Sequence, residues 1–214
     1  IDRGLVGSEM CIRDRIDSEI DNLKGFMPKH EGIALTKWSE KFSSIGPIME
    51  IGSYCGKSAI YLSKGAILND QLVYTIDHHF GSEEHQIKEE YFDSEIFDYK
   101  NQRVNTLPLL IKNINKIQVK NIVPIVSNSV DIASKWNAKL GMVFIDGGHS
   151  FKAANNDYVS WSTKIKKNGA LVIHDIFENP DEGGQAPFEI FQKALKNNFE
   201  VYERVDTLAC LIKN

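Results

Sequence analysis

The stretch MEIGSYCGKSA, residues 49–59, decides the fold of this 214-residue chain. An apolar run that contains Glu50 leads into a glycine turn and then into residues with helical spacing, as expected where a strand enters a helix. The ending Gly-Lys-Ser resembles a phosphate-binding loop, but such a loop needs four residues between its first glycine and Gly-Lys. Only three residues separate Gly52 from Gly56, and Glu50 would repel a triphosphate. The stretch therefore favours a cationic ligand over ATP.

Strand-like and helix-like runs alternate along the rest of the chain. The predicted strands cover residues 47–52, 72–76, 122–126, 142–145 and 170–173. The predicted helices cover residues 57–66, 107–117, 130–136, 151–165 and 187–195. The last two runs, 199–204 and 208–212, are too close together for a helical crossover, so they must pair antiparallel. This order predicts one α/β domain, a doubly wound, mostly parallel seven-stranded sheet with helices on both faces and an antiparallel C-terminal strand pair.

Composition narrows the class of protein. The chain has 25 Lys and Arg against 29 Asp and Glu, a net charge of −4, and its lysines are dispersed. A nucleic-acid partner would need a basic face, so none is expected. No apolar run reaches roughly 18 residues, so we expect no membrane span. Apart from Cys11, only Cys55 and Cys210 are present, without metal-type spacing, and this favours a reducing, cytoplasmic location.

The first residues do not resemble natural protein. GLVGSEMCIRDR, residues 4–15, is similar to the translated end of an adapter used to build shotgun sequencing libraries. We therefore expect residues 1–15 to be non-native and the native domain to cover residues 16–214, with its own start missing. The source is then expected to be a metagenomic assembly.

Polar residues stand at five predicted strand ends. In open α/β sheets, ligands bind outside the carboxyl ends of the strands. Asp77 ends the second strand, where an acid can accept both ribose hydroxyls of an adenosine. An acid, a glycine turn and a second acid together indicate a site for a positively charged adenosyl compound. The residues at the five ends are Glu50 with Gly52, Asp77, the turn 127–129, Asp146 with His149, and His174 with Asp175.

EIGSYCGKS at 50–58, with Asp77 and the terminal strand pair, resembles the class I S-adenosylmethionine-dependent methyltransferases. The residues of this motif are especially similar to those of the catechol-type O-methyltransferases. FIDGGHSFKAANNDYVSW at 144–161 and GALVIHDIF at 169–177 resemble a bacterial branch of small-molecule methyltransferases, related to enzymes that O-methylate sugars on macrolides. The resemblance covers about residues 25–212. It implies S-adenosylmethionine as cofactor, a small-molecule acceptor with a hydroxyl group and, because relatives are often dimers, a homodimer.

The resemblance also implies roles for individual residues. Glu50 would face the methionine amino group, directly or through water, and His78 would lie beside the adenosine. The two glycines would let the backbone approach the cofactor, because a side chain there would collide with it. The implied cofactor-binding residues are Glu50, Gly52, Ser53, Tyr54, Gly56, Ser58, Asp77, His78, Ser129 and Asp146.

Methyl transfer to a hydroxyl group needs a general base, or a cation that stabilises the alkoxide. Asp146 and Asp175 end adjacent strands, so their carboxylates can converge on one divalent cation, Mg²⁺ or a transition metal. Asp146-Gly-Gly-His149 has the Asp-x-x-His spacing that supplies a ligand and a base in the macrolide-sugar enzymes, so Asp146 and His149 are the expected catalytic residues. Where catechol-type enzymes have Asp-Asn, this chain has Asp175-Ile176 after His174.

Alternatives stay open at two points. His174 could complete the metal site with Asp146 and Asp175, water or His149 could take the third position, or His174 could be a core histidine with no metal bound. A nicotinamide-dependent oxidoreductase and a non-catalytic adenosyl-binding protein are the other function classes. The first loop lacks the Gly-x-Gly-x-x-Gly spacing, and a pure binding module would not need His149 or the strand-end acids. Two long loops, 80–102 and 178–185, are candidate lids, the second with Gly183-Gly184 as a hinge.

Overall fold

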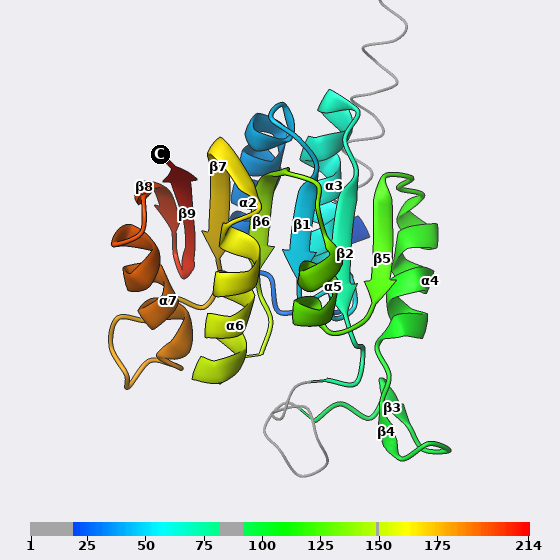
Figure 1. Ribbon diagram of the computed structural model, residues 1–214. Helices are drawn as coiled ribbons and strands as arrows, with labels where there is room; N and C mark the ends of the chain where they lie inside the picture. The colour runs from blue at the N-terminus through cyan, green and yellow to red at the C-terminus, as the bar shows by residue number, and fades with distance from the viewer. Residues whose placement is uncertain (1–18, 82–91, 149) are drawn as a thin grey trace, which may run out of the picture.

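The computed structural model describes residues 19–81, 92–148 and 150–214. A seven-stranded sheet forms its centre (Figure 1). Its strands are β1 (Ile48–Ile51), β2 (Val73–Asp77), β5 (Ile122–Val126), β6 (Leu140–Ile145), β7 (Ile165–Ile173), β8 (Phe199–Val205) and β9 (Leu208–Lys213). Across the sheet the strand order is β5-β2-β1-β6-β7-β9-β8.

The pairing of the strands confirms the predicted fold. β1 pairs in parallel with β2 and β6, β2 pairs in parallel with β5, and β6 pairs in parallel with β7. β9 runs antiparallel to both of its neighbours, β7 and β8, as the short connection between the last two strands requires. The chain order reverses between β1 and β6, and open sheets of this kind place their ligand crevice at such a point.

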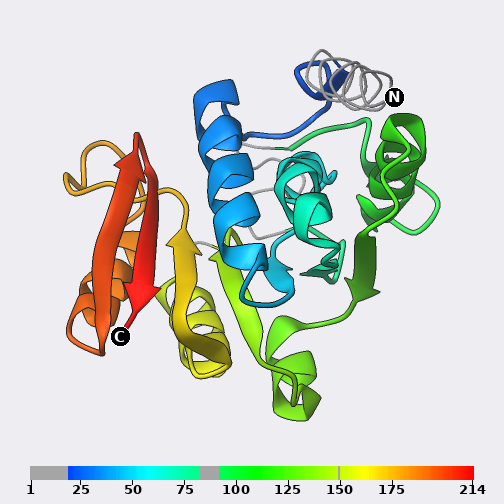
Figure 2. The ribbon, with the colours of Figure 1, turned by 90° about the horizontal axis from the view of Figure 1, so that it is seen from above.

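Helices cover both faces of the sheet (Figures 1 and 2). Side chains of α2 and α3 pack on one face, and side chains of α5, α6 and α7 pack on the other. Met142 and Phe144 belong to the first core and Val143 and Ile145 to the second, because successive side chains of a strand point to opposite faces. The helices are α2 (Lys29–Ser43), α3 (Lys57–Ala66), α4 (Leu107–Ile117), α5 (Ser129–Lys135), α6 (Phe151–Ser162) and α7 (Ala186–Leu195).

Several element boundaries differ from the predicted ones. α6 ends at Ser162 rather than at residue 165, and β7 already begins at Ile165. The predicted turn at 168–169 lies inside β7, where Asn168 has a φ of 62° and the register with β6 shifts. Trp136, predicted to be helical, has an extended backbone just after α5. No bounds were predicted for helix α2, although its Trp38 was expected on a helical pattern in the core, and Trp38 is buried there together with Phe42.

The long segment after β2 contains a small hairpin that the sequence analysis did not predict. β3 (Phe97–Asp98) and β4 (Arg103–Val104) pair antiparallel and project beyond the carboxyl ends of the parallel strands (Figure 1). Residues 82–91 of the predicted loop lie outside the described residues. Within the part of the chain that the structure describes, no helix combines the length and the hydropathy that crossing a bilayer requires.

Candidate active site

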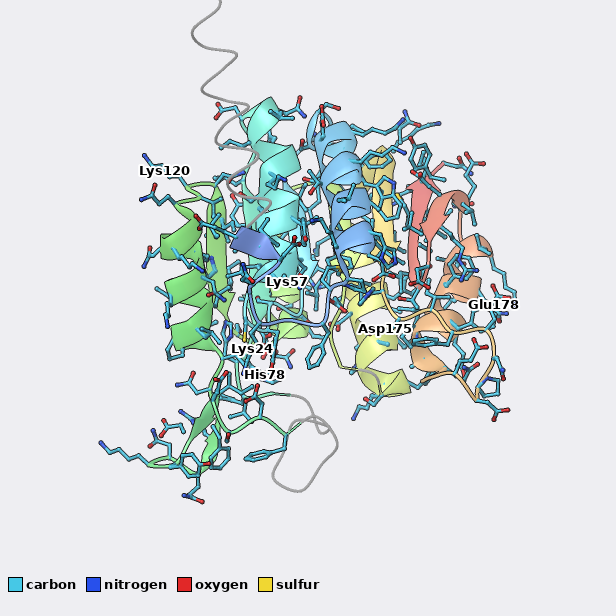
Figure 3. All side chains as sticks on the ribbon, turned by 180° about the vertical axis from the view of Figure 1, so that it is seen from behind. Lys24, Lys57, His78, Lys120, Asp175 and Glu178 are labelled. Atoms are coloured by element: carbon cyan, nitrogen blue, oxygen red, sulfur yellow. The ribbon has the colours of Figure 1, made fainter. Side chains whose placement is uncertain are left out.

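A cleft of about 990 Å³ opens at the carboxyl ends of the parallel strands. This volume is at the upper end of the range for small-ligand pockets, roughly 300–1,000 Å³. Figure 3 shows Lys57, His78 and Asp175 at this end of the sheet, with Lys57 at the start of α3. The predicted site residues that line the cleft are Gly52, Ser53, Tyr54, Ser58, Asp77, His78, Ser129, Asp146, His174 and Asp175.

Asp77 connects the glycine turn to the loop after β2. Its Oδ2 accepts hydrogen bonds from the backbone N–H groups of Ser53 (3.1 Å) and Tyr54 (2.9 Å), and its Oδ1 accepts one from the N–H of His79 (2.7 Å). Tyr54 holds a positive φ of 45° in this turn. The carboxylate therefore shapes the floor of the cleft, a role that its position at a strand end did not reveal.

The two glycines of the turn are required by the protein itself. Gly52 has a φ of 95°, and a Cβ atom there would lie 2.0 Å from the backbone oxygen of Asp146. Gly56 has a φ of 87°, and its Cβ would lie 2.4 Å from Cδ1 of Leu110. Residues other than glycine rarely adopt such φ values, so both positions favour glycine, and the backbone contact at Gly52 excludes a Cβ atom as well. The predicted reason, a collision of a side chain with the cofactor, stays a prediction beside this packing.

Glu50 is completely buried on β1 and does not line the cleft. Thr75 Oγ1 donates a hydrogen bond to its Oε2, and the hydroxyl groups of Thr75 and Ser53 lie 2.5 Å apart, so Ser53 connects Glu50 to the cleft. The other carboxylate oxygen of Glu50, Oε1, has no hydrogen-bond partner among the described residues. Burial raises the pKa of Glu50 to about 8. A direct contact with the cofactor, one of the two predicted forms, is not available in this arrangement.

Two histidines follow Asp77 and differ in environment. His78, which was predicted to lie beside the adenosine, is exposed and lines the cleft, and its Nδ1 accepts a hydrogen bond from the N–H of Phe80 (3.0 Å). His79 is buried and was not predicted as a site residue. Its Nδ1 lies 2.7 Å from Oγ1 of Thr106, and burial lowers its pKa. His79 therefore packs behind the cleft as a neutral ring.

The predicted metal residues Asp146, His174 and Asp175 come together at the ends of β6 and β7. One ligand atom of each lies within 4.8 Å of the others. Nδ1 of His174 lies 2.9 Å from Oδ1 of Asp146 and 3.5 Å from Oδ2 of Asp175. Its Nε2 lies 2.8 Å from Oε2 of Glu31. The two ring nitrogens of His174 thus face carboxylates on opposite sides.

These carboxylates determine the charge of His174. Burial by itself lowers the pKa of the imidazole, but Asp146, Glu31 and Asp175 outweigh burial and raise the pKa to about 11. The ring therefore carries two N–H groups in the described arrangement and donates both. A metal ligand needs a free lone pair on nitrogen, so an ion at this position would have to replace the proton on Nδ1.

Glu31 was missed by the sequence analysis. It is completely buried on α2, and its Oε1 accepts hydrogen bonds from the N–H (2.9 Å) and the hydroxyl group (2.8 Å) of Thr207. Glu31 thus joins α2, the end of β7 and the turn between β8 and β9. A signal was present, because Glu31 precedes the buried Leu35 and Trp38 by four and seven residues and so shares their helix face.

Asp157 on α6 was also missed. Ser129 Oγ, at the start of α5, donates a hydrogen bond to its Oδ1, and both residues line the cleft. Only 6% of Asp157 is exposed, and burial raises its pKa to about 6. Its spacing to the buried Ala154 and Trp161, three residues before and four after it, could have indicated an inward position.

Two predicted features remain to be placed. His149, the predicted base, lies outside the described residues. The second predicted loop does border the cleft, through residues 180–184. A Cβ atom at Gly183 would lie 2.3 Å from the ring of Phe177, so this glycine is packed closely against an aromatic ring. Gly184 has open space around it and is the better candidate for the hinge.

Similar solved structures establish the class of fold. PaMTH1 from Podospora anserina, bound to S-adenosylhomocysteine, is 13% identical with a TM-score of 0.62, over 100% of this chain and 89% of that chain. The O-methyltransferase NovP is 11% identical with a TM-score of 0.65, over 87% and 80% of the two chains. The O-methyltransferase TomG from Streptomyces achromogenes, in complex with S-adenosylmethionine, is 14% identical with a TM-score of 0.60, over 100% and 91%. The fold is thus that of the class I methyltransferases.

A family model described as a methyltransferase domain matches residues 49–176, which is more than half of the chain. The protein belongs to this methyltransferase family. The matched segment begins within β1 and ends just after Asp175. It therefore includes the glycine turn and the ends of β6 and β7, which carry Asp146, His174 and Asp175. Membership favours methyl transfer over the nicotinamide-dependent alternative.

Proposed function

We propose that the protein transfers a methyl group from S-adenosylmethionine to a hydroxyl oxygen of a small-molecule acceptor. The observation that carries this proposal is the single cleft of about 990 Å³, which joins the glycine turn to the cluster of Asp146, His174 and Asp175. A pocket of that volume has room for a cofactor and an acceptor side by side. NovP and TomG, which share the fold, are O-methyltransferases.

The charges of the cleft support a cationic cofactor. S-adenosylmethionine carries a sulfonium and an ammonium group, and Asp77 and Asp146 place carboxylates along the cleft. In our proposal Asp77 accepts hydrogen bonds from the ribose hydroxyls while it continues to hold the turn. Glu50 acts from behind the turn, through Thr75 and Ser53 and through water, on the methionine amino group.

The reaction itself is an in-line displacement from a good leaving group, so the protein must align the acceptor and remove its proton. We assign the proton to His149 on the basis of its spacing from Asp146. His149→Ala should then lower the rate by roughly 10²–10⁴, the usual scale for loss of a general base. The loss should shrink at higher pH, because hydroxide can replace the base.

The residues present also fit a divalent ion. Asp146, His174 and Asp175 would hold it, with Nδ1 of His174 as the nitrogen ligand, because Glu31 already accepts the hydrogen of Nε2. When bound, such an ion would lower the pKa of the acceptor hydroxyl. Mg²⁺ usually binds oxygen ligands only, whereas imidazole nitrogen suits transition metals. The nitrogen ligand of this site therefore favours a transition metal over Mg²⁺. Without the ion, Glu31 and His174 fix the position of the Asp146 carboxylate through the two ring nitrogens of His174.

Calorimetry tests the cofactor assignment. S-adenosylhomocysteine should bind the wild-type protein, and Asp77→Ala should weaken binding by about 1–3 kcal/mol, the cost of unpaired polar groups. Asp131→Asn, an exposed acid on α5, is the matched control and should bind normally. Micromolar binding of ATP together with no binding of the adenosyl compound would contradict the proposal. A panel of sugar, phenol and polyketide-glycoside acceptors with labelled cofactor would then identify the acceptor class.

A further inference from the structure

A short segment before α2 borders the cleft and has no role in the chemistry described above. Three of the four residues in the segment 24–27, here called the strap, line the cleft. The strap is anchored on both sides, because Ile20 and Leu23 before it and Met27 at its end are buried in the core that also contains side chains of α2 and α3. The strap therefore passes beside the cleft between two fixed points.

The strap rests on the glycine turn. The ring of Phe26 lies against the ring of Tyr54, with 5.4 Å between their centroids and an angle of 38° between their planes. A Cβ atom at Gly25 would lie only 2.9 Å from Cβ of Lys57, so glycine lets the strap pass close to the start of α3. Tyr54 and Lys57 themselves line the cleft. The strap thus stands at the part of the cleft where our proposal places the cofactor.

Lys24 connects the strap to the segment that follows β2. Its ammonium group is paired with the carboxylates of Asp93 and Glu95, and these contacts are here called the clasp. Burial by itself lowers the pKa of Lys24, but the hydrogen bonds and charges of the two acids outweigh burial and raise the pKa. The clasp is therefore charged at neutral pH. Figure 3 shows Lys24 at the same end of the sheet as His78.

Both sides of the clasp pack on the glycine turn, but the clasp itself is only partly shielded. Ile96 and Phe97, just after the two acids, pack in a cluster with Cys55 of the turn. The side chains of Lys24 and Asp93 are 26% and 27% exposed. An ion pair that water reaches is weak and is screened by salt. The clasp can therefore break and form again while the buried anchors of the strap stay in place.

We propose that the strap is a gate, which opens to admit S-adenosylmethionine and to release S-adenosylhomocysteine, and that the clasp sets how often it opens. This inference rests on the proposed use of this cofactor. A gate changes the association and dissociation rates by the same factor, because the ligand passes through the same open state in both directions. Loss of a direct contact with the ligand instead changes mainly the dissociation rate, and so weakens binding.

The test measures both rates for S-adenosylhomocysteine by surface plasmon resonance. In Lys24→Met both rates should rise by about 2- to 5-fold, the range that loss of a partly exposed ion pair allows, with Kd nearly unchanged. Lys112→Met, at an exposed position on α4, is the matched control and should keep the wild-type rates. The double variant Asp93→Asn/Glu95→Gln should act like Lys24→Met, and the triple variant should add nothing further, because all of them remove the same clasp.

Two results would overturn the inference. One is unchanged rates in folded Lys24→Met, and the other is a faster dissociation alone, with weaker binding, which would make Lys24 part of a rigid wall that touches the ligand.

If the clasp variants do not fold, trypsin decides on the wild type, because the peptide bond after Lys24 becomes accessible when the strap opens. Saturating S-adenosylhomocysteine should slow this cleavage by a larger factor than cleavage after Lys112. Equal factors at the two sites would contradict the gate. Absence of S-adenosylhomocysteine binding to the wild type would instead contradict the proposed function, so the two failures are distinguishable.

Discussion

Glu31 and His174 are 143 residues apart in the chain, and their side chains are joined by a hydrogen bond of 2.8 Å between Oε2 and Nε2. Both are buried, and Oε1 of Glu31 is held by Thr207. The pair thus ties helix α2 to the end of β7 and to the C-terminal hairpin of β8 and β9. It also fixes which nitrogen of His174 faces Asp146 and Asp175.

Replacing Glu31 tests this connection. Glu31→Gln keeps the shape but removes the charge, and breaking one side of a buried ion pair costs about 3–5 kcal/mol. Urea unfolding should therefore show a large loss of stability. Glu40→Gln, an exposed position on the same helix, is the matched control and should change stability by less than about 0.5 kcal/mol. Equal stability of the two variants would show that the buried pair contributes little.

Variants of His174 and Asp175 distinguish a metal-binding role of this cluster from a purely structural one. Asp175→Ala should abolish binding of Mn²⁺ or Mg²⁺ in a calorimetric titration while leaving S-adenosylhomocysteine binding largely intact. His174→Ala should weaken metal binding and also lower the melting temperature, because it leaves Glu31 buried without its partner. Unchanged metal binding in His174→Ala would leave the histidine a purely structural role, as a bridge between two carboxylates.

Glu50 makes stability depend on pH in a defined direction. Its folded pKa of about 8 lies above the ordinary value of 4.5, so the folded state binds the proton more tightly. The resulting stabilisation is complete below about pH 4.5 and is lost as the pH rises through 8. Glu50→Gln removes this dependence. From pH 5 to pH 8 the stability of the variant relative to the wild type should therefore rise by roughly 3–4 kcal/mol, measured by urea unfolding at both pH values. A difference that does not change with pH would contradict this account of the buried acid.

Gly52 offers a test of the packing explanation for the turn. In Gly52→Ala the new methyl group meets the backbone oxygen of Asp146 at 2.0 Å, and the φ of 95° is unfavourable for alanine. Overpacking of this kind costs about 1–3 kcal/mol. Gly184→Ala is the control, because nothing lies within 4 Å of its Cβ position. Melting temperatures of the ligand-free proteins should fall for the first variant only. If Gly52→Ala instead melts normally and only loses cofactor binding, the sequence-based explanation was the better one.

Much of the fold could be predicted from local pattern. The helices at 57–66 and 107–117 and the strand at 122–126 have the predicted bounds, because apolar spacing and flanking turns define them. The strand-end acids were found because the topology of a parallel sheet brings such ends together. The bounds of helix α2, beyond the helical pattern around Trp38, were not predicted because its buried face contains polar residues, among them Ser39 and Glu31.

The partners of buried polar residues could not be predicted. On sequence alone, Glu31 and Asp157 resemble solvent-exposed helix acids, since nothing local shows that His174 or Ser129 will stand opposite them. Their roles follow from tertiary contacts across 143 and 28 residues. The domain boundary at residue 16, the metagenomic source, the cytoplasmic location, the homodimer and the lack of a nucleic-acid partner stay predictions.

Transfer of an isotope-labelled methyl group tests the central claim most directly. The protein is incubated with S-[methyl-¹³C]adenosylmethionine, a divalent metal and a panel of hydroxyl-bearing acceptors, and the products are examined by NMR and mass spectrometry. The account predicts stoichiometric formation of S-adenosylhomocysteine and a ¹³C signal in the region of methyl groups bonded to oxygen, both abolished in Asp146→Ala. Label on nitrogen or carbon, or turnover unaffected in Asp146→Ala, would contradict it.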